Sequence, residues 1–357
     1  MPNFRKILLG CTLAIGDVVM ATSAAALLKK IYPEARISII VKKLAEEVVI
    51  NNPVIDEVIS ANYQQKKASF DYMRNLVKHL KSQQYDLFVS LDGKFRPALL
   101  ATLAGIPVRI GPSSMFGSDT RLPLLFTTIY PVGDFKTTHY TEVLQSMVRR
   151  LTNSQLAAQP VLPCISPDNH AKAASLLERL PASRHLIGFC AKTNPRKTWP
   201  AQRFADLMTI LSEKYDAAIY TIGGPYDQEY IDNLISLTTA PVANFCGQTS
   251  LVDLMALLTK TDVFVSLDTA PMHIASAMDI PLVAVFGSTA PASVAPLSAK
   301  AAILAPELPC IPCIPLRVQV FPGISRWTGP KTCPEQRCMN QITVDQVLAA
   351  ITHKLSN

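Results

Sequence analysis

Short apolar runs alternate with segments of helical periodicity along almost the whole of this 357-residue chain. Apolar runs of about four to eight residues are typical of strands buried on both faces, and a repeated strand–helix–strand series predicts a parallel sheet covered by helices on both sides. Residues 157–169 carry prolines without a clear period and interrupt the alternation, so they suit a linker. The sequence therefore predicts an α/β chain of two doubly wound parallel-sheet domains that face each other across a cleft.

The predicted domains are residues 1–165 and 166–340, and residues 341–357 are expected to form a helix that can pack back on the first domain. The length of the chain agrees with two domains rather than one. Ligands of such sheets bind at the carboxyl ends of the strands, near the point where the strand order reverses. The loops of interest therefore follow Leu13, Cys190, Ile222, Ser266 and Phe286.

The composition narrows the possible partners. The net charge is +7, and the basic excess early in the chain suits either a solvated surface or a phosphorylated or anionic-lipid substrate. No nucleic-acid-binding motif is present, and no run reaches the ~20 apolar residues of a membrane span. Residues 5–26 imitate a signal peptide, but Asp17 places a charge directly after the apolar run. We interpret this segment as the first strand, loop and helix of a cytoplasmic protein.

The segment Val263–Ala277 is the most informative part of the second half. An apolar strand is followed by Asp268 and Thr269, which can both cap a helix whose N-terminal N–H groups and dipole favour a phosphate. An ordinary capped helix has the same pattern, so the segment alone leaves both interpretations open. His273, one turn into this helix, can touch a ligand or simply pack, and Gly287 after the next strand is a further candidate.

Three other loops carry residues suited to sugar-nucleotide chemistry. Asp17, at a predicted helix start, can be a general base or an N-terminal cap. The ammonium of Lys197 can neutralise a diphosphate or face solvent. Gly223 allows close approach of a nucleotide, and Asp227 can accept hydrogen bonds from hydroxyls or cap a helix.

The sequence contains one weak indication of a metal site. The spacing of the terminal cysteines permits zinc, but the second pair is loosely spaced, so free thiols or a local disulfide are alternatives. The six histidines have no ligand-like spacing, and neither a P-loop nor a nucleophile elbow is present. We therefore expect no metal, with one zinc alternative at Cys310, Cys313, Cys333 and Cys338.

Taken together, these motifs resemble glycosyltransferase family 9, the ADP-heptose:lipopolysaccharide heptosyltransferases. The resemblance covers nearly the whole chain, and the ordered set of motifs is specific although each motif alone is not. The matching segments are Ile15–Val18 with Pro33, Gly105–Gly111, Lys197–Pro200, Cys246–Leu251, and Asp268–His273 leading to Phe286-Gly287.

The resemblance implies a GT-B fold and an inverting transfer of heptose, or a related sugar, from an ADP-sugar to a lipopolysaccharide or lipooligosaccharide core acceptor. It implies no cofactor beyond the nucleotide-sugar, and a cytoplasmic enzyme that meets the inner face of the membrane peripherally. Asp17 is implied as the base and Lys197 as the cation at the diphosphate. The implied donor contacts are Asp227, Asp268, Thr269, Ala270, His273, Gly223 and Gly287, and the expected acceptor contacts are Lys66, Lys67, Lys94 and Arg96.

Two departures from the family pattern bear on the donor. Ala270 stands where the family usually has glycine, and it would be strained by roughly 1 kcal/mol if that position needs a positive φ. Asp227 is one methylene shorter than the usual glutamate. Three rival interpretations remain open at this point: another sugar-nucleotide enzyme such as an epimerase, a non-catalytic two-domain sugar-binding protein, and a family member that binds without transfer.

Overall fold

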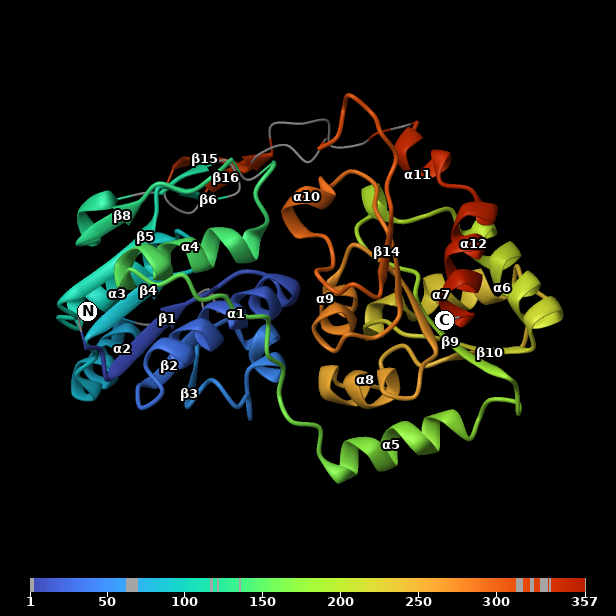
Figure 1. Ribbon diagram of the computed structural model, residues 1–357, viewed down its shortest axis with the longest axis horizontal. Helices are drawn as coiled ribbons and strands as arrows, with labels where there is room; N and C mark the ends of the chain where they lie inside the picture. The colour runs from blue at the N-terminus through green and yellow to red at the C-terminus, as the bar shows by residue number, and fades with distance from the viewer. Residues whose placement is uncertain are drawn as a thin grey trace. The chain divides into compact units, whose positions relative to one another are not determined.

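The computed structural model describes residues 3–61, 70–115, 118–120, 122–134, 136–312, 317–321, 324–327, 333 and 335–356. The chain divides into two compact units (Figure 1). The first contains the described residues up to Cys164 together with the antiparallel pair β15 (Arg317–Phe321) and β16 (Ile324–Trp327). The second contains the remaining described residues from Ile165 onward. Each unit is built around its own six-stranded sheet.

All neighbouring strands of the first sheet are parallel, in the order β3-β2-β1-β4-β5-β8. The strand order reverses between β1 and β4, and we call the carboxyl ends of these two strands the first switch point. The strands are β1 (Lys6–Gly10), β2 (Arg36–Val41), β3 (Glu57–Ser60), β4 (Leu87–Ser90), β5 (Val108–Pro112) and β8 (Thr128–Tyr130), and a small antiparallel pair joins β6 (Ser114–Met115) to β7 (Ser118–Asp119).

Helices cover this sheet in two pairs, as expected for a doubly wound domain. The helices α1 and α4 contact each other, and so do α2 and α3. The small side chains of α1 are almost all buried, and the helix ends at Ile31, with Tyr32 as its C-cap directly before Pro33. The bounds are α1 (Ile15–Ile31), α2 (Phe70–Gln83), α3 (Phe95–Leu103) and α4 (Tyr140–Thr152), with short 3-10 turns η1 (Lys43–Val48) and η2 (Pro123–Leu125).

The second sheet repeats the plan of the first. Its neighbouring strands are all parallel, in the order β11-β10-β9-β12-β13-β14. The order reverses between β9 and β12, and their carboxyl ends form the second switch point. The strands are β9 (His185–Cys190), β10 (Ala217–Thr221), β11 (Val242–Asn244), β12 (Val263–Leu267), β13 (Leu282–Val285) and β14 (Ala301–Leu304).

On one side, α6 and α7 pack over this sheet, and on the other α5 packs on α8, which contacts α9. The bounds of the helices and 3-10 turns are α5 (Pro167–Leu177), η3 (Pro195–Lys197), α6 (Ala201–Tyr215), η4 (Pro225–Asp227), α7 (Gln228–Ile235), α8 (Leu251–Leu258), α9 (Ala270–Ala277), α10 (Pro291–Val294), α11 (Arg337–Gln341) and α12 (Val344–Leu355).

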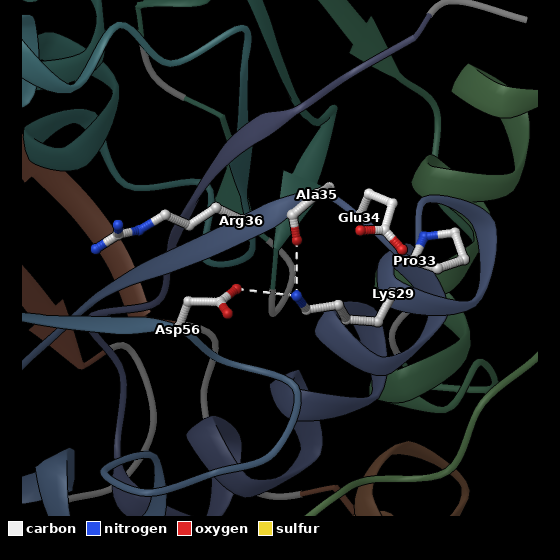
Figure 2. Close-up of a pocket in the computed structure, with 6 residues that line it drawn as sticks. All are labelled: Lys29, Pro33, Glu34, Ala35, Arg36 and Asp56. Carbon is white, nitrogen blue, oxygen red and sulfur yellow. Dashed lines mark hydrogen bonds and ion pairs between the residues drawn. The ribbon is translucent and has the colours of Figure 1, made fainter.

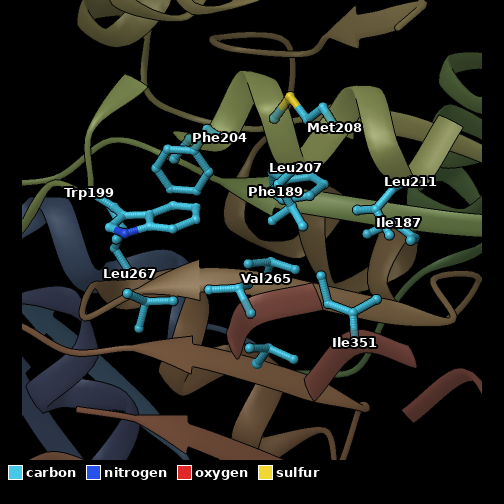
Figure 3. Packing of buried hydrophobic residues seen from close by; sticks show 14 of the residues in the cluster. Ile187, Phe189, Trp199, Phe204, Leu207, Met208, Leu211, Val265, Leu267 and Ile351 are labelled. Atoms are coloured by element: carbon cyan, nitrogen blue, oxygen red, sulfur yellow. The ribbon is translucent and has the colours of Figure 1, made fainter. Parts of the chain in front are cut away.

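The core cluster of the second unit surrounds three aromatic side chains, Phe189, Trp199 and Phe204, with aliphatic ones (Figure 3). Trp199 is fully buried, and its ring meets that of Phe204 edge-on with a centroid distance of 4.9 Å. Burial of each large apolar side chain stabilises the fold by about 1.5–3 kcal/mol. The indole Nε1 of Trp199 donates a hydrogen bond of 2.9 Å to the carbonyl of Ile342. The loop after β9 is therefore anchored to the C-terminal segment by its tryptophan.

The C-terminal helix α12 belongs to the second unit. The helix α12 contacts α6 and strands β12, β13 and β14, and it buries Val347 and Ile351 in the core that Trp199 occupies. Its amphipathic face therefore already has a partner within the second sheet, which the sequence pattern did not identify. No helix within the described ranges has both the length and the hydropathy to cross a membrane.

Candidate functional site

Asp17 lies at the first switch point, in the first turn of α1. It is half-buried, and its Oδ2 accepts a hydrogen bond of 3.2 Å from the backbone N–H of Ala14, which precedes the helix. A carboxylate at this position satisfies a free N–H group and interacts favourably with the positive end of the helix dipole. The capping interpretation of Asp17 is therefore correct, and the partial exposure of the carboxylate also leaves it accessible for chemistry.

A second carboxylate, that of Asp92, stands across the switch point and was missed by the sequence analysis. Asp92 is buried, and its Oδ2 accepts hydrogen bonds of 2.7 Å from both the backbone N–H and the hydroxyl of Thr12. Its Oδ1 accepts from the backbone N–H of Lys94 at 2.9 Å. Asp92 thus joins the loop after β1 to the loop after β4. Its position directly after an apolar run, in Leu91-Asp92-Gly93, was the available signal.

Two of the expected acceptor-binding cations lie in the same region. The ammonium of Lys94 donates to the carbonyl of Thr12 at 2.9 Å, which holds this half-buried side chain against the loop that precedes Asp17. Arg96 is exposed in the first turn of α3. Lys66 and Lys67 lie outside the described residues.

The interior behind this site is strongly unfavourable for further negative charge. Burial raises the pKa of the Cys11 thiol, and the nearby carboxylates of Asp92 and Asp17 raise it further. Burial likewise raises the pKa of Tyr140, whose hydroxyl donates to the carbonyl of Leu91 at 2.7 Å. Cys11 and Tyr140 are therefore neutral packing groups.

At the second switch point, Lys197 and Asp268 form an ion pair. Lys197 ends the turn η3 after β9, Asp268 follows β12, and Lys197 Nζ lies 2.5 Å from Asp268 Oδ2. The hydroxyl of Thr289, from the loop after β13, donates to the same oxygen at 2.6 Å. Three loops from neighbouring strands therefore meet at one buried carboxylate, and the structure brings together two residues that the sequence analysis listed separately.

The Asp268 carboxylate remains ionised despite its burial. Burial alone would raise the pKa of Asp268, but the charges of Lys197 and His273 and the hydrogen bonds from Lys197 and Thr289 outweigh it and hold this pKa below its usual range. His273 is itself buried one turn into α9. The cluster thus holds a fixed cation at the carboxyl ends of the central strands, which is suitable for an anionic ligand.

The helix α9 begins at Ala270 and has Thr269 as its N-cap, but the Thr269 side chain makes no capping hydrogen bond. Asp268 does not cap the helix either, because its Oδ2 is used by Lys197 and Thr289. Ala270 is absent from the described non-glycine residues with positive φ, so the strain considered for an alanine here does not arise. The N-terminus of α9 therefore presents backbone N–H groups next to the ion pair, an arrangement that favours phosphate.

The loop after β10 carries Gly223 and Asp227. The Oδ2 of Asp227 accepts from the backbone N–H of Gly224 at 2.9 Å, so the carboxylate caps the turn η4, as one of the two interpretations expected. A Cβ at Gly223 would lie 2.9 Å from the Cys246 sulfur, so this glycine is required by protein packing. Burial and the charge of Asp227 raise the pKa of Cys246 to about 12.

Gly287 also has a packing role. A Cβ at this position would collide with the sulfur of Met339 and approach the carbonyl of Arg196 to 3.5 Å. Met339 lies in α11, is fully buried, and shares the core with Cys338. The glycine therefore allows the C-terminal segment to pack against the loops of the second switch point.

The cysteines of the zinc alternative differ in environment. Cys310 is exposed, Cys333 is half-buried and Cys338 is buried in the apolar core, whereas Cys313 lies outside the described residues. Within the described ranges, no three His, Cys, Asp or Glu side chains are grouped so that they could hold a metal ion.

A pocket of about 490 Å³ lies in the first unit, away from the first switch point (Figure 2). It forms where α1 ends and β2 begins, at the edge of the sheet opposite to the carboxyl ends. The ammonium of Lys29 pairs with Asp56 at 3.0 Å and donates to the carbonyl of Ala35 at 2.7 Å. These contacts close the connection between α1 and β2, so we assign the pocket a structural role. Its lining residues are Lys29, Pro33, Glu34, Ala35, Arg36 and Asp56.

The two Rossmann-like units have the GT-B fold, and the cluster of Lys197, Asp268 and Thr289 lies in the second unit. The model of glycosyltransferase family 9 (heptosyltransferase) matches residues 73–318, and the chain belongs to this family. The match begins after Asp17, which therefore lies outside it.

Several characterised proteins are similar to this chain. Lipooligosaccharide heptosyltransferase 2 of Haemophilus ducreyi is 30% identical over 81% of this chain and 85% of its own length. Lipopolysaccharide heptosyltransferase 2 of Salmonella typhimurium is 27% identical over the same shares of the two chains. Among solved structures, a family 9 glycosyltransferase from Veillonella parvula aligns with a TM-score of 0.81 at 21% identity, covering 99% of this chain and 97% of the other. ADP-heptose LPS heptosyltransferase II of E. coli aligns with a TM-score of 0.77 at 22% identity, covering 99% and 98%.

Proposed function

We propose that this glycosyltransferase transfers heptose from ADP-heptose to a lipopolysaccharide or lipooligosaccharide core acceptor. Family membership and the names of the heptosyltransferases that it resembles support this reaction. The structural observation that carries the proposal is the cluster of Lys197, Asp268 and Thr289 at the second switch point. It holds a cation beside the open N-terminus of α9, where a nucleotide diphosphate would bind.

Asp17 is proposed as the general base. Its half-buried carboxylate would take the proton of the acceptor hydroxyl as the oxygen attacks the anomeric carbon of the donor. The bond from that carbon to the diphosphate oxygen breaks, and ADP leaves with the bonding electron pair. Asp92 is less suited to this role, because it is buried and engaged with Thr12 and Lys94.

Lys197 is proposed to stabilise the departing diphosphate. Charge develops on the leaving group in the transition state, and a fixed ammonium in a half-buried site stabilises that charge without reorganisation. The backbone at Thr269 and Ala270, at the N-terminus of α9, would contact the same phosphates. In this mechanism the cation comes from the protein, so we infer that transfer requires no metal ion.

The remaining contacts are proposed from their places in each unit. Lys94 and Arg96 would contact anionic groups of the acceptor, because they follow β4 beside the loop of Asp17. Asp227, with Gly223, would contact the donor nucleoside, and His273 would support Asp268 rather than touch the sugar. Lys66 and Lys67 remain acceptor candidates from sequence alone.

We further propose that the enzyme works in the cytoplasm, peripherally at the inner membrane where lipid-linked acceptors are held. Leu124 is 76% exposed in η2, and Leu103 is 56% exposed in α3, which contacts η2. Exposed leucines at adjoining elements suit a lipid surface. Co-sedimentation with anionic vesicles checks this proposal: Leu124→Glu should reduce binding, and equal binding of both proteins would contradict this surface.

The transfer reaction is tested with ADP-heptose and a truncated lipopolysaccharide core acceptor. The intact protein should release ADP and glycosylated product, whereas Asp17→Asn should lose about 10²–10⁴-fold in rate, the usual contribution of a general base. The asparagine keeps an oxygen for the Ala14 N–H, so α1 should remain capped. Asp71→Asn is the matched control, since Asp71 is an exposed first-turn aspartate of α2 in the same unit.

The outcomes separate the parts of the proposal. Equal rates for Asp17→Asn and the intact protein would remove Asp17 from the mechanism. Failure to make product, combined with binding of ADP, would point to another sugar donor or acceptor. Failure to bind ADP as well would contradict the proposed function.

A further inference from the structure

Lys192 is a second cation near the carboxyl end of β9, and the sequence analysis assigned it no role. It lies two residues after the strand, and its Nζ is 4.3 Å from the centroid of the Tyr230 ring. Both side chains are half-buried. Over the described ranges, Lys192 has no carboxylate within ion-pair distance, whereas Lys197 on the same loop is paired with Asp268. Lys192 therefore places a positive charge in a partly desolvated position opposite an aromatic face.

The surroundings place this charge on the nucleoside side of the proposed donor site. Tyr230 lies three residues after Asp227, so the two side chains share one side of the α7 start. The Cys190 thiol donates to the carbonyl of Lys192, and burial together with the charge of Asp227 raises the pKa of Cys190 to about 12. Strand order puts β10, which leads to Asp227, on one flank of β9, and β12, which leads to Asp268, on the other.

Charge balance distinguishes the two lysines. The charge of Lys197 is partly balanced by Asp268, so this pair offers a directed N–H group and less positive charge than a lysine without a carboxylate partner. The charge of Lys192 is not balanced in this way. A cation–π contact of this kind contributes about 0.5–1 kcal/mol, whereas a charge-assisted hydrogen bond to phosphate is roughly twice as strong as a neutral one. An incoming phosphate should therefore displace the ring as the partner of the ammonium.

We propose that Lys192 is a binding residue for the donor diphosphate, contacting the phosphate next to the nucleoside while Lys197 contacts the phosphate bonded to the sugar. In the absence of the donor, the ammonium rests on Tyr230. This inference rests on the proposed function, because it assumes a nucleoside diphosphate at the second switch point. It assigns Lys192 to donor affinity and selectivity for charged nucleotides, and leaves the chemical step to Asp17 and Lys197.

The test is a calorimetric titration of the full-length protein with ADP, AMP and adenosine. Lys192→Met should bind ADP and AMP at least tenfold more weakly and adenosine unchanged, because only the phosphate contact is lost. Lys192→Arg should restore most of the affinity. Lys260→Met is the matched control, since it removes one exposed lysine charge from the same unit and should leave all three affinities unchanged.

Each other outcome overturns the assignment. Unchanged ADP binding by Lys192→Met would exclude Lys192 from the diphosphate, and an equal loss for adenosine would show that it acts on the nucleoside or the fold. If the intact protein binds no ADP, the proposed function itself fails. Titration of inorganic pyrophosphate into the intact protein and Lys192→Met then decides whether this lysine binds phosphate, because the variant should again be at least tenfold weaker.

Discussion

At the first switch point, the buried carboxylate of Asp92 accepts hydrogen bonds from backbone N–H groups and a hydroxyl, whereas at the second, Asp268 accepts them from an ammonium and a hydroxyl. The two sheets have the same strand order, so the difference lies in the loops. In the first unit the donors to Asp92 are neutral, and the ammonium of Lys94 donates to the carbonyl of Thr12 instead. In the second unit the ammonium of Lys197 balances the charge of Asp268, and the ion pair holds this ammonium in a fixed orientation. One fold thus supports a proposed base at one switch point and a proposed cation at the other.

After Asp17→Asn, the largest expected effect comes from removal of that cation. Lys197→Met should lower kcat by roughly 10²–10³-fold, because one electrostatic contact to the leaving group is lost. Steady-state assays with ADP-heptose measure this change. Lys172→Met is the matched control, since Lys172 also pairs with a buried aspartate of the same unit, Asp253, at 2.6 Å. Equal losses in the two variants would mean that Lys197 acts through stability alone.

A smaller effect is expected from Asp92→Asn. Asp92 Oδ2 accepts from Thr12 and Oδ1 accepts from the N–H of Lys94, so the amide NH2 of asparagine would face the donors of one of these two residues and hydrogen bonds to a buried charged group would be lost. The first unit should be destabilised by about 3 kcal/mol, as urea unfolding would measure. Activity of the folded fraction should fall less than in Asp17→Asn. A greater loss of activity than in Asp17→Asn would exchange the roles proposed for the two carboxylates.

The ion pair of Lys172 and Asp253 shows how much a buried, hydrogen-bonded carboxylate contributes to the stability of the second unit. Burial would raise the pKa of Asp253, but hydrogen bonds from Lys172, Asn169 and Ser250 lower it to about 2. Because this pKa is below that of the unfolded chain, near 3.8, the carboxylate stabilises the fold above about pH 4, and this contribution disappears as the pH falls toward 2.

The depressed pKa corresponds to about 2 kcal/mol at neutral pH. Asp253→Asn should lose that amount at pH 7, measured by denaturant unfolding, and its stability should vary less between pH 4 and pH 2 than that of the intact protein. Unchanged activity is expected, since this pair lies between α5 and α8. A variant with the pH profile of the intact protein would contradict the lowered pKa.

The smallest expected effect is that of Ala270→Gly. Ala270 is the first residue of α9 and has no positive φ, so glycine should cost up to about 1 kcal/mol through backbone entropy and give no gain in donor affinity. Thermal unfolding and ADP titration measure both quantities. Tighter ADP binding by the variant would show that donor binding requires a backbone conformation that alanine disfavours.

The sequence predicted the alternation of strands and helices well, because buried parallel strands are marked by continuous apolar runs and their ends by glycine, proline and capping residues. It also identified Lys197 and Asp268 as candidates. It did not predict that they pair, since 71 positions separate them and the contact depends on β9 and β12 being neighbours.

Other features had weaker signals. Asp92 was not selected, because an aspartate before a glycine is typical of any turn, and only the adjacency of β1 and β4 gives it a partner in Thr12. Trp199 follows Lys197 in the loop after β9, yet it is a core side chain whose indole N–H donates to the carbonyl of Ile342. The position of α12 depends on the same long-range packing. Local patterns thus specify elements and loops, whereas pairings between loops follow from the strand order.

The contact between Gly287 and Met339 has a consequence for sequence variation within the family. The thioether of Met339 occupies the space that a Cβ at position 287 would fill, so the side chains at the two positions compete for the same volume. A relative with a larger residue at the position of Gly287 should therefore carry a smaller one at the position of Met339. Substitutions near the C-terminus should therefore covary with substitutions in a loop at the proposed donor site.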